Sequence, residues 1–224
     1  MSTQRIRIWD LPTRIFHWSL AALVFSAIVT AKLGGGAMVW HERIGVLLTG
    51  LIAFRLAWGF VGSTYARFAQ FLPSPATLLA YVQGRWRGAG HNPFGALSVC
   101  ALLALLCALL ATGLAGNDDI AFRGPLFDLV GKDTSDRLTA WHRLLTTLLF
   151  ALIGLHLAAV AFHALVKKDD LVRPMLSGWK EIESGAVEPA RGGGPKALLA
   201  ALLIALACAC AASGAWLPTP PPPP

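Results

Sequence analysis

Residues 141–157 read WHRLLTTLLFALIGLHL, an apolar run with a histidine near each end, and this stretch decides the fold. Such a run predicts a helix that crosses the ~30 Å hydrocarbon core of a membrane. His142 and His156 are 14 residues apart, which at 100° per residue brings them to within about 40° of the same face. They lie about 21 Å apart along the axis. One helix therefore presents two imidazoles to one side, one near each membrane surface.

The composition of the whole chain is that of a membrane protein. Of 224 residues, 55% are hydrophobic and only 14% are charged, whereas soluble domains carry about 25% charged residues. This excludes a secreted disulfide scaffold, a disordered chain and most soluble enzymes. The net charge is +7, but the basic residues lie in loops and no Cys/His finger or basic-aromatic pattern accompanies them, so we expect no nucleic-acid partner.

Five apolar segments predict five membrane helices. They cover approximately residues 15–33, 39–61, 92–116, 137–166 and 197–217. We expect an all-α membrane protein, a four-helix transmembrane bundle with a fifth, C-terminal transmembrane helix. The expected division is residues 1–180 as the bundle domain, 181–196 as a cytoplasmic linker, 197–217 as the additional helix and 218–224 as an extended proline-rich tail. A cleaved signal peptide is the alternative for the first segment, but His17 interrupts its apolar core and the segment is long for a signal.

The basic residues predict the orientation in the membrane. With the N-terminus in the cytoplasm, 13 of the 19 Lys and Arg residues are cytoplasmic and six lie on the other side. The outer segment 117–136 also carries five aspartates. We therefore expect a multi-pass protein of the bacterial inner membrane with a cytoplasmic N-terminus and a periplasmic C-terminus.

Four histidines lie well inside the expected spans, where polar side chains are costly and indicate function. His17 is near the inner surface and His41 near the outer surface. The fourth helix runs inward, so depth pairs His142 with His41 and His156 with His17. Two pairs that bridge helices across the membrane predict two bis-histidine haem b sites.

Other uses of the histidines stay open at this point. Zinc or copper is the second candidate for what the histidines bind, although structural zinc prefers four protein ligands around one ion. A proton relay is a third, and a non-redox protein with structural histidines a fourth. The four cysteines form no C-x-x-C-H or C-x-x-C motif, which excludes covalent c-type haem. Small residues beside the ligands, Gly45 and Gly154, would let a flat macrocycle approach.

The motifs around these histidines resemble the bacterial cytochrome b561 family, which is related to the b-type cytochrome subunits of nickel-iron hydrogenases and formate dehydrogenases. The resemblance covers about residues 5–180. It lies in WDLPTRIFHW at residues 9–18, HERIG at 41–45, GHNP at 90–93, WH at 141–142, LH at 155–156 and DLVRPM at 170–175.

The resemblance implies a four-helix bundle with two b haems and His17, His41, His142 and His156 as the axial iron ligands. It implies respiratory electron transfer between a periplasmic partner, such as a cytochrome c or an oxidoreductase subunit, and a quinone. The fifth helix and the tail lie outside it. His163 is also extra, and it could compete with His156 as the partner of His17.

Two arginines, one histidine and six tryptophans carry further expectations. Arg14 and Arg55, at the inner ends of the first two helices, are candidates for pairing with haem propionates, with interfacial snorkelling as the alternative. His91 is expected to shape a turn, with a quinone-side role as the alternative. Six tryptophans near span ends predict an interfacial aromatic belt, and these are Trp9, Trp18, Trp40, Trp58, Trp141 and Trp216.

We expect an electron carrier or oxidoreductase subunit rather than a classical substrate-converting enzyme. With two haem b groups, His41/His142 outside and His17/His156 inside, an electron could cross between the surfaces. The acidic outer segment 117–136 is a candidate dock for a basic periplasmic donor. The alternative is a stand-alone quinone-linked haem oxidoreductase that uses a small diffusible donor, and a second copy of the chain is a further candidate partner.

Overall fold

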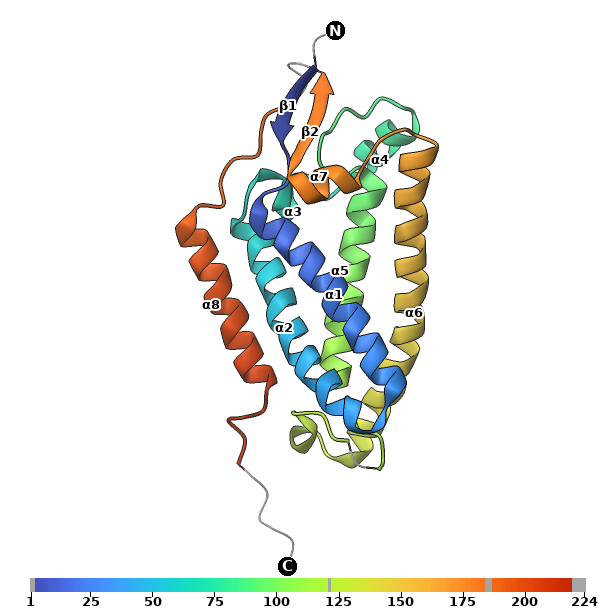
Figure 1. Cartoon of the computed structure of the whole chain (residues 1–224), viewed down its shortest axis with the longest axis vertical. Coiled ribbons are helices and arrows are strands. Elements are labelled where there is room, and N and C mark those ends of the chain that lie inside the picture. The colour runs from blue at the N-terminus through green and yellow to red at the C-terminus, as the bar shows by residue number, and fades with distance from the viewer. Residues whose placement is uncertain (1–2, 121, 184–186, 219–224) are drawn as a thin grey trace, which may run out of the picture.

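The computed structural model describes residues 3–120, 122–183 and 187–218. Within these ranges, five helices are long and apolar enough to cross a membrane (Figure 1). They are α1 (Leu11–Leu33), α2 (Met38–Val61), α5 (Pro93–Leu114), α6 (Lys132–Leu165) and α8 (Pro195–Ala212). The chain is an all-α membrane protein, as expected.

Short elements cover both ends of the bundle. A two-stranded antiparallel sheet pairs β1 (Thr3–Arg7) with β2 (Trp179–Glu183), so that Arg7 lies opposite Trp179. We call the end of the bundle with these strands the sheet end, and the end with residues 115–131 the loop end. The remaining elements are η1 (Gly35–Ala37), η2 (Thr64–Ala66), α3 (Phe68–Phe71), α4 (Pro75–Val82), η3 (Phe127–Leu129) and α7 (Val172–Ser177).

Two helices begin before their apolar runs, because polar residues near their starts are held by hydrogen bonds. α1 begins at Leu11 instead of residue 15, since the carboxylate of Asp10 accepts a hydrogen bond from the Thr13 amide at 2.7 Å. α6 begins at Lys132 instead of residue 137. Its first turn contains the fully buried Ser135, whose hydroxyl donates to the carbonyl of Ala115 at 2.7 Å. α5 begins at Pro93 with Asn92 as its N-cap, as the sequence predicts.

The fifth helix is shorter than expected. It ends at Ala212 rather than at residue 217, and the chain turns at Gly214, whose φ is +66°. A Cβ at Gly214 would lie within 2.2 Å of the Pro125 carbonyl oxygen, so only glycine fits this turn. Of the expected proline tail, residues 219–224 lie outside the described residues.

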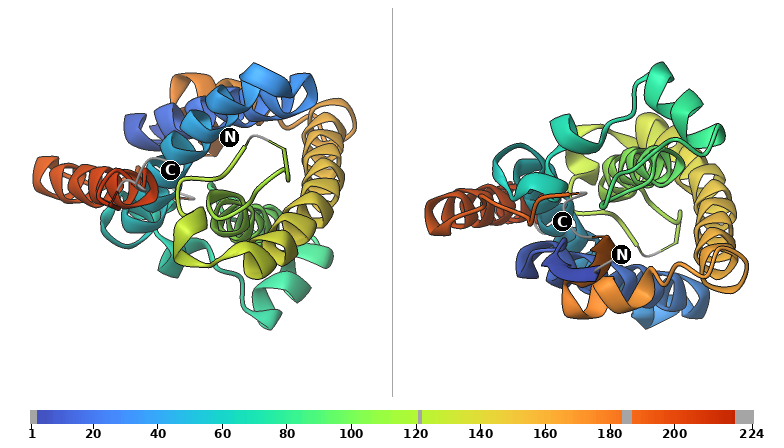
Figure 2. Two further views of the ribbon diagram at one scale, coloured as in Figure 1. Left: turned by 90° about the horizontal axis from the view of Figure 1, so that it is seen from below. Right: turned by 90° about the horizontal axis from the view of Figure 1, so that it is seen from above.

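Four helices form the bundle and the fifth lies outside it. α1 packs against α2, α2 against α5, and α5 against α6. Seen from either end, α8 lies on the outer side of α2, away from α6 (Figure 2). The main apolar core joins buried side chains of all five helices, including Phe16, Trp58, Leu106, Leu149 and Ala201.

The segment after the fourth helix is attached to the sheet end. β2 spans the boundary expected at residue 180. Farther on, the amide of Ala190 donates to the Arg7 carbonyl at 2.8 Å, and the Arg191 carbonyl accepts from the amide of Thr64 at 2.8 Å. A small apolar cluster around Ile8 and Trp9 covers this end. Within the segment expected as a linker, residues 181–183 and 190–191 therefore contact the sheet end.

Candidate functional site

Four histidines from three helices form two facing pairs at opposite ends of the bundle. His17 of α1 faces His156 of α6 with ring centroids 6.5 Å apart, and we call these the sheet-end pair. His41 of α2 faces His142 of α6 with ring centroids 6.2 Å apart, and these are the loop-end pair. In the described part of the chain α6 packs closely only against α5. The rings of each pair therefore meet across the interior, in the combination that depth along the helices predicts.

The separation of the rings suits a metal ion held between two imidazoles. A metal–nitrogen bond is about 2 Å long and the nitrogen lies about 1 Å from the ring centroid, so two ligands on opposite sides of one ion have centroids about 6 Å apart. Both pairs match this value. No group of three or more His, Cys, Asp or Glu side chains that could hold a metal ion occurs among the described residues. The donor set is therefore two imidazoles at each end, as an iron already held in a macrocycle requires.

Backbone carbonyls orient both rings of the loop-end pair. Nδ1 of His41 lies 2.9 Å from the carbonyl oxygen of Ala27 in α1, and Nδ1 of His142 lies 2.9 Å from that of Leu109 in α5. A carbonyl only accepts, so each Nδ1 carries the proton and each Nε2 keeps its lone pair. This is the arrangement of metal-binding histidines, in which the far nitrogen donates to a second group.

A glycine leaves space on α2 where a flat group would need it. A Cβ at Gly45, one turn beyond His41, would meet no atom within 4 Å, and the same is true at Gly154, two residues before His156. Gly45 is four residues from His41 and within about 40° of the same face, so it agrees with the expectation that small residues beside the ligands admit a macrocycle. Gly154 does not, because two residues turn it about 160° away from His156 and it is exposed on the outside of α6.

His163 belongs to a different group of side chains at the sheet end. Its Nε2 lies 3.3 Å from the side-chain nitrogen of Asn92, and its Nδ1 lies 3.8 Å from Asp169, which also pairs with Lys180 at 2.8 Å. The ring that faces His17 is that of His156. The structure thus places His163 outside the sheet-end pair, where it was the alternative to His156 as the partner of His17.

Arg55 is buried in the apolar core at the level of the sheet-end pair. It follows His41 by 14 residues on α2, so it lies about 21 Å farther along the axis and within about 40° of the same face. Its side chain is only 2% exposed. The guanidinium lies 5.1 Å from the ring centroid of Phe68 and 6.0 Å from that of Phe16, and its Nη1 has no hydrogen-bond partner. No carboxylate within the described ranges lies within 4.0 Å of it.

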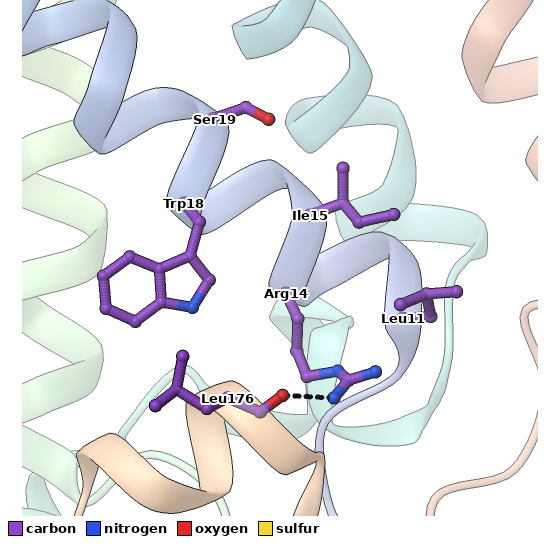
Figure 3. A pocket seen from close by; sticks show the side chains of 6 residues that line it. All are labelled: Leu11, Arg14, Ile15, Trp18, Ser19 and Leu176. Atoms are coloured by element: carbon purple, nitrogen blue, oxygen red, sulfur yellow. Dashed lines mark hydrogen bonds between the residues drawn. The ribbon is translucent and has the colours of Figure 1, made fainter.

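Arg14 takes a different position from Arg55. Its Nη1 donates to the Leu176 carbonyl at 2.5 Å, in a pocket of about 320 Å³ on the face of α1 that meets α7 (Figure 3). Trp18 and Leu176 line the same pocket. Of the two arginines predicted to pair with propionates, Arg55 has the unpartnered nitrogen atom in the bundle core, whereas Arg14 is engaged with the cap.

Trp58 and Trp9 do not belong to an interfacial belt, and that expectation is wrong for them. Trp58 is fully buried and its indole nitrogen donates to the Asp10 carboxylate at 3.0 Å, which also accepts from the hydroxyl of Ser63. Trp9 is 8% exposed and lies 4.7 Å from the ring of His91. Proximity to a span end does not separate a tryptophan that faces lipid from one that the cap covers. Trp18, Trp40, Trp141 and Trp216 are exposed, as the belt requires.

Sequence reasoning missed the backbone groups of the site and the aromatic cage around Arg55. The carbonyls of Ala27 and Leu109 carry no signal, because every residue has one. Phe68 and Phe71 lie in the short helix α3, which no apolar periodicity reveals. Gly113 had a usable signal as a glycine inside an apolar span. A Cβ there would lie 2.8 Å from Cε1 of His142.

The part of the chain that matches known proteins contains the residues of this site. A model of the prokaryotic cytochrome b561 family matches residues 8–178. The chain is 20% identical over 220 residues to a probable Ni/Fe-hydrogenase 1 B-type cytochrome subunit of Escherichia coli (strain K12), covering 80% of this chain and 92% of that protein. It is 24% identical over 216 residues to a probable Ni/Fe-hydrogenase B-type cytochrome subunit of Azotobacter chroococcum mcd 1, covering 78% and 88%. No solved structure matches the chain.

Proposed function

Because this chain belongs to the prokaryotic cytochrome b561 family, we propose that it is a b-type cytochrome that carries electrons across the cytoplasmic membrane through two haem b groups. The observation that carries the proposal is the pair of facing imidazoles at each end of the bundle, with ring centroids 6.5 and 6.2 Å apart. The spacing of His142 and His156 on α6 separates the two sites by about 21 Å along the helix axis.

The side chains have distinct tasks in this proposal. His17 and His156 hold one iron, and His41 and His142 hold the other. With two imidazoles committed to each iron, the sites would offer no ligand position to small molecules. Bound haem supplies one-electron reduction and oxidation at the iron. The apolar core around the four histidines excludes water and keeps the pairs in a low dielectric.

Gly45 and the arginines complete the cofactor-binding set. Gly45 keeps the face of α2 beside His41 open. Arg55 is the better placed of the two propionate partners, since its Nη1 lies buried without a partner. Arg14 anchors the cap through the Leu176 carbonyl and has its Nε left for the same role.

The sheet end is cytoplasmic in the proposed topology and the loop end is periplasmic, by the distribution of basic residues. A periplasmic donor or acceptor meets the loop-end haem, and a quinone exchanges electrons at the other side. The names of the relatives favour a nickel-iron hydrogenase as the redox partner, and a soluble cytochrome c is the second candidate. The acidic outer segment 117–136 offers a surface for a basic partner.

A reduced-minus-oxidised absorption spectrum of the purified chain tests the proposal directly. We expect a b-type α-band and two haems for each chain in a pyridine haemochrome assay. A purified, folded chain without an α-band would exclude every haem function and leave the non-redox alternative.

Replacing each histidine with alanine tests the ligand pairs. We expect His17→Ala and His156→Ala to remove the same haem, and His41→Ala and His142→Ala to remove the other, while the haem at the opposite end remains. His163→Ala is the matched control and should keep both haems. Loss in any other combination would contradict the assignment.

A further inference from the structure

The two histidine pairs differ in their hydrogen bonds. At the loop end, His41 and His142 each direct Nδ1 to a backbone carbonyl. At the sheet end, Nδ1 of His17 is buried without a partner, and neither ring of that pair has a carbonyl bond in the part of the chain that the structure describes. A bond from the far nitrogen to a carbonyl makes an imidazole a more basic ligand. A more basic ligand favours the oxidised iron.

The buried polar atoms without a hydrogen-bond partner also gather at the sheet end. Among the described residues they belong to Thr13, Arg14, His17, Arg55, Arg67, His91 and His163. All of these lie in the sheet-end part of α1, α2 and α6 or in the segments that cover that end. The sheet end therefore has unmet donors inside the protein, and none occurs among the loop-end residues that the structure describes.

Three of these donors belong to arginines, which carry a full charge, and Arg55 is the most deeply buried of the three. Asp10 is the buried acid of this end, and its negative charge acts on Arg55 through space. No ion pair within 4.0 Å joins the two among the described residues, and the carboxylate oxygens of Asp10 accept instead from the Thr13 amide, the Trp58 indole and the Ser63 hydroxyl. A buried cation is costly unless an anion compensates its charge. Phe16, which the guanidinium contacts, is the residue before His17. A carboxylate beside His17 would meet that need.

We propose that the two haem sites have unequal reduction potentials, the sheet-end site being the higher because Arg55 binds one of its propionates. The inference rests on the proposed function and goes beyond it. Reduced iron carries one positive charge less than oxidised iron, so a buried cation nearby favours reduction. The carbonyl-bonded imidazoles of His41 and His142 act in the opposite direction at the loop end.

A redox titration of the full-length protein, followed by haem absorbance, tests the order of the potentials. We expect two components in the wild-type chain. The higher one should disappear in His17→Ala and the lower one in His41→Ala. A single shared potential, or a higher potential at the loop-end pair, would overturn the proposal.

Variants of Arg55 test the cause. Arg55→Gln should lower the potential of the higher component, or cost that haem alone, and leave the lower component unchanged. Arg55→Lys should restore most of the difference, and it also serves if the glutamine variant does not accumulate. The matched control is Arg87→Gln, an exposed residue between α4 and α5 whose loss changes the net charge equally.

The outcomes distinguish a failure of this inference from a failure of the proposed function. Equal small shifts in Arg55→Gln and Arg87→Gln would reduce the effect to long-range charge and overturn the role of Arg55. Two haems that sit on the predicted pairs with no response to Arg55 would overturn this inference and leave the proposed function standing. A chain that binds no haem would instead remove the proposed function.

Discussion

Gly113 shows how closely the neighbouring helix confines the loop-end pair. The residue lies in α5, and a Cβ there would stand 2.8 Å from Cε1 and 3.0 Å from Nδ1 of His142. That nitrogen is bonded to the Leu109 carbonyl one turn earlier in α5. The ring is therefore held between a hydrogen bond and a surface that has no room for a side chain.

We expect Gly113→Ala to displace the His142 ring and weaken the loop-end haem. Overpacking of this kind costs about 1–3 kcal/mol, so the haem content at that end should fall while the sheet-end haem stays. Haem quantification and the difference spectrum measure this. Gly36→Ala is the control, since a Cβ at Gly36 would meet no atom within 4 Å. Full occupancy of both sites in Gly113→Ala would contradict the prediction.

Protonation of His91 makes the stability of the folded chain depend on pH. Its ring lies 4.7 Å from that of Trp9 and 4.8 Å from that of Phe71. Burial, with a smaller contribution from the charge of Arg55, lowers the pKa of His91 to about 3. In the unfolded chain its pKa is about 6.5. Between these values the unfolded chain binds a proton that the folded chain does not, so stability falls as the pH is lowered through this range.

We therefore expect His91→Gln to flatten the pH dependence of stability. The melting temperature of the wild-type chain in detergent should drop between pH 7.5 and pH 4.5 by more than that of the variant. Thermal unfolding followed by tryptophan fluorescence at the two pH values measures the difference. Parallel drops in both proteins would show that other groups carry the effect.

The helix α8 attaches to the bundle through small residues. Gly50 of α2 lies nine residues after His41, which places it about 180° around the helix from the ligand face. A Cβ at Gly50 would lie 3.0 Å from the Ala205 carbonyl oxygen and 3.1 Å from the Cβ of Ala209. Small residues let membrane helices approach in this way. α8 therefore closes the outer side of α2, at a distance from the histidines.

We expect Gly50→Leu to separate α8 from α2 and leave both haems in place. The larger side chain cannot fit against Ala205, so the melting temperature should fall and the segment before α8 should become sensitive to protease. Leu203→Ala is the control, since Leu203 is 58% exposed on α8. Loss of haem in Gly50→Leu would show that α8 supports the ligand helices, against the packing that we observe.

The two ends of the whole molecule differ in their charged residues. The loop end carries aspartates, but not all of them are available to a partner. Asp118 accepts hydrogen bonds from the amides of Ile120 and Phe122, and Asp119 pairs with Lys132. These carboxylates hold the conformation of the loop. Asp128 and Asp133 are exposed at the same end, and they are the better test of a docking surface.

Changing Asp128 and Asp133 together to asparagine should slow electron exchange with a basic soluble cytochrome c by a few-fold at low ionic strength. The salt dependence of the rate should decrease as well, because exposed charges act mainly through steering. Stopped-flow kinetics at several salt concentrations measure both quantities. Glu181→Gln, an exposed change on β2 at the sheet end, should leave the rate unchanged. An unchanged salt dependence in the double variant would remove the docking role of this loop.

Much of the architecture could be predicted from the order of residues along the chain. The five spans follow from apolar runs, and the pairing of His17 with His156 and of His41 with His142 follows from their depth in helices of alternating direction. Helix ends were less accurate, because caps such as Asp10 lie outside the apolar runs. The β1–β2 sheet escaped prediction, since it pairs segments more than 170 residues apart.

The distinction between the two ends of the molecule depends on contacts between helices. Arg14 and Arg55 are equivalent in the sequence, as basic residues at inner helix ends. Packing places Arg14 against the cap, where it donates to a backbone carbonyl, and buries Arg55 among phenylalanines. Trp58 and His163 likewise acquire their partners from distant segments. The period of a helix and the thickness of a membrane act locally and fix depth and facing. Which side chain ends up without a partner depends on lateral packing, where residues far apart in the chain compete for the same space.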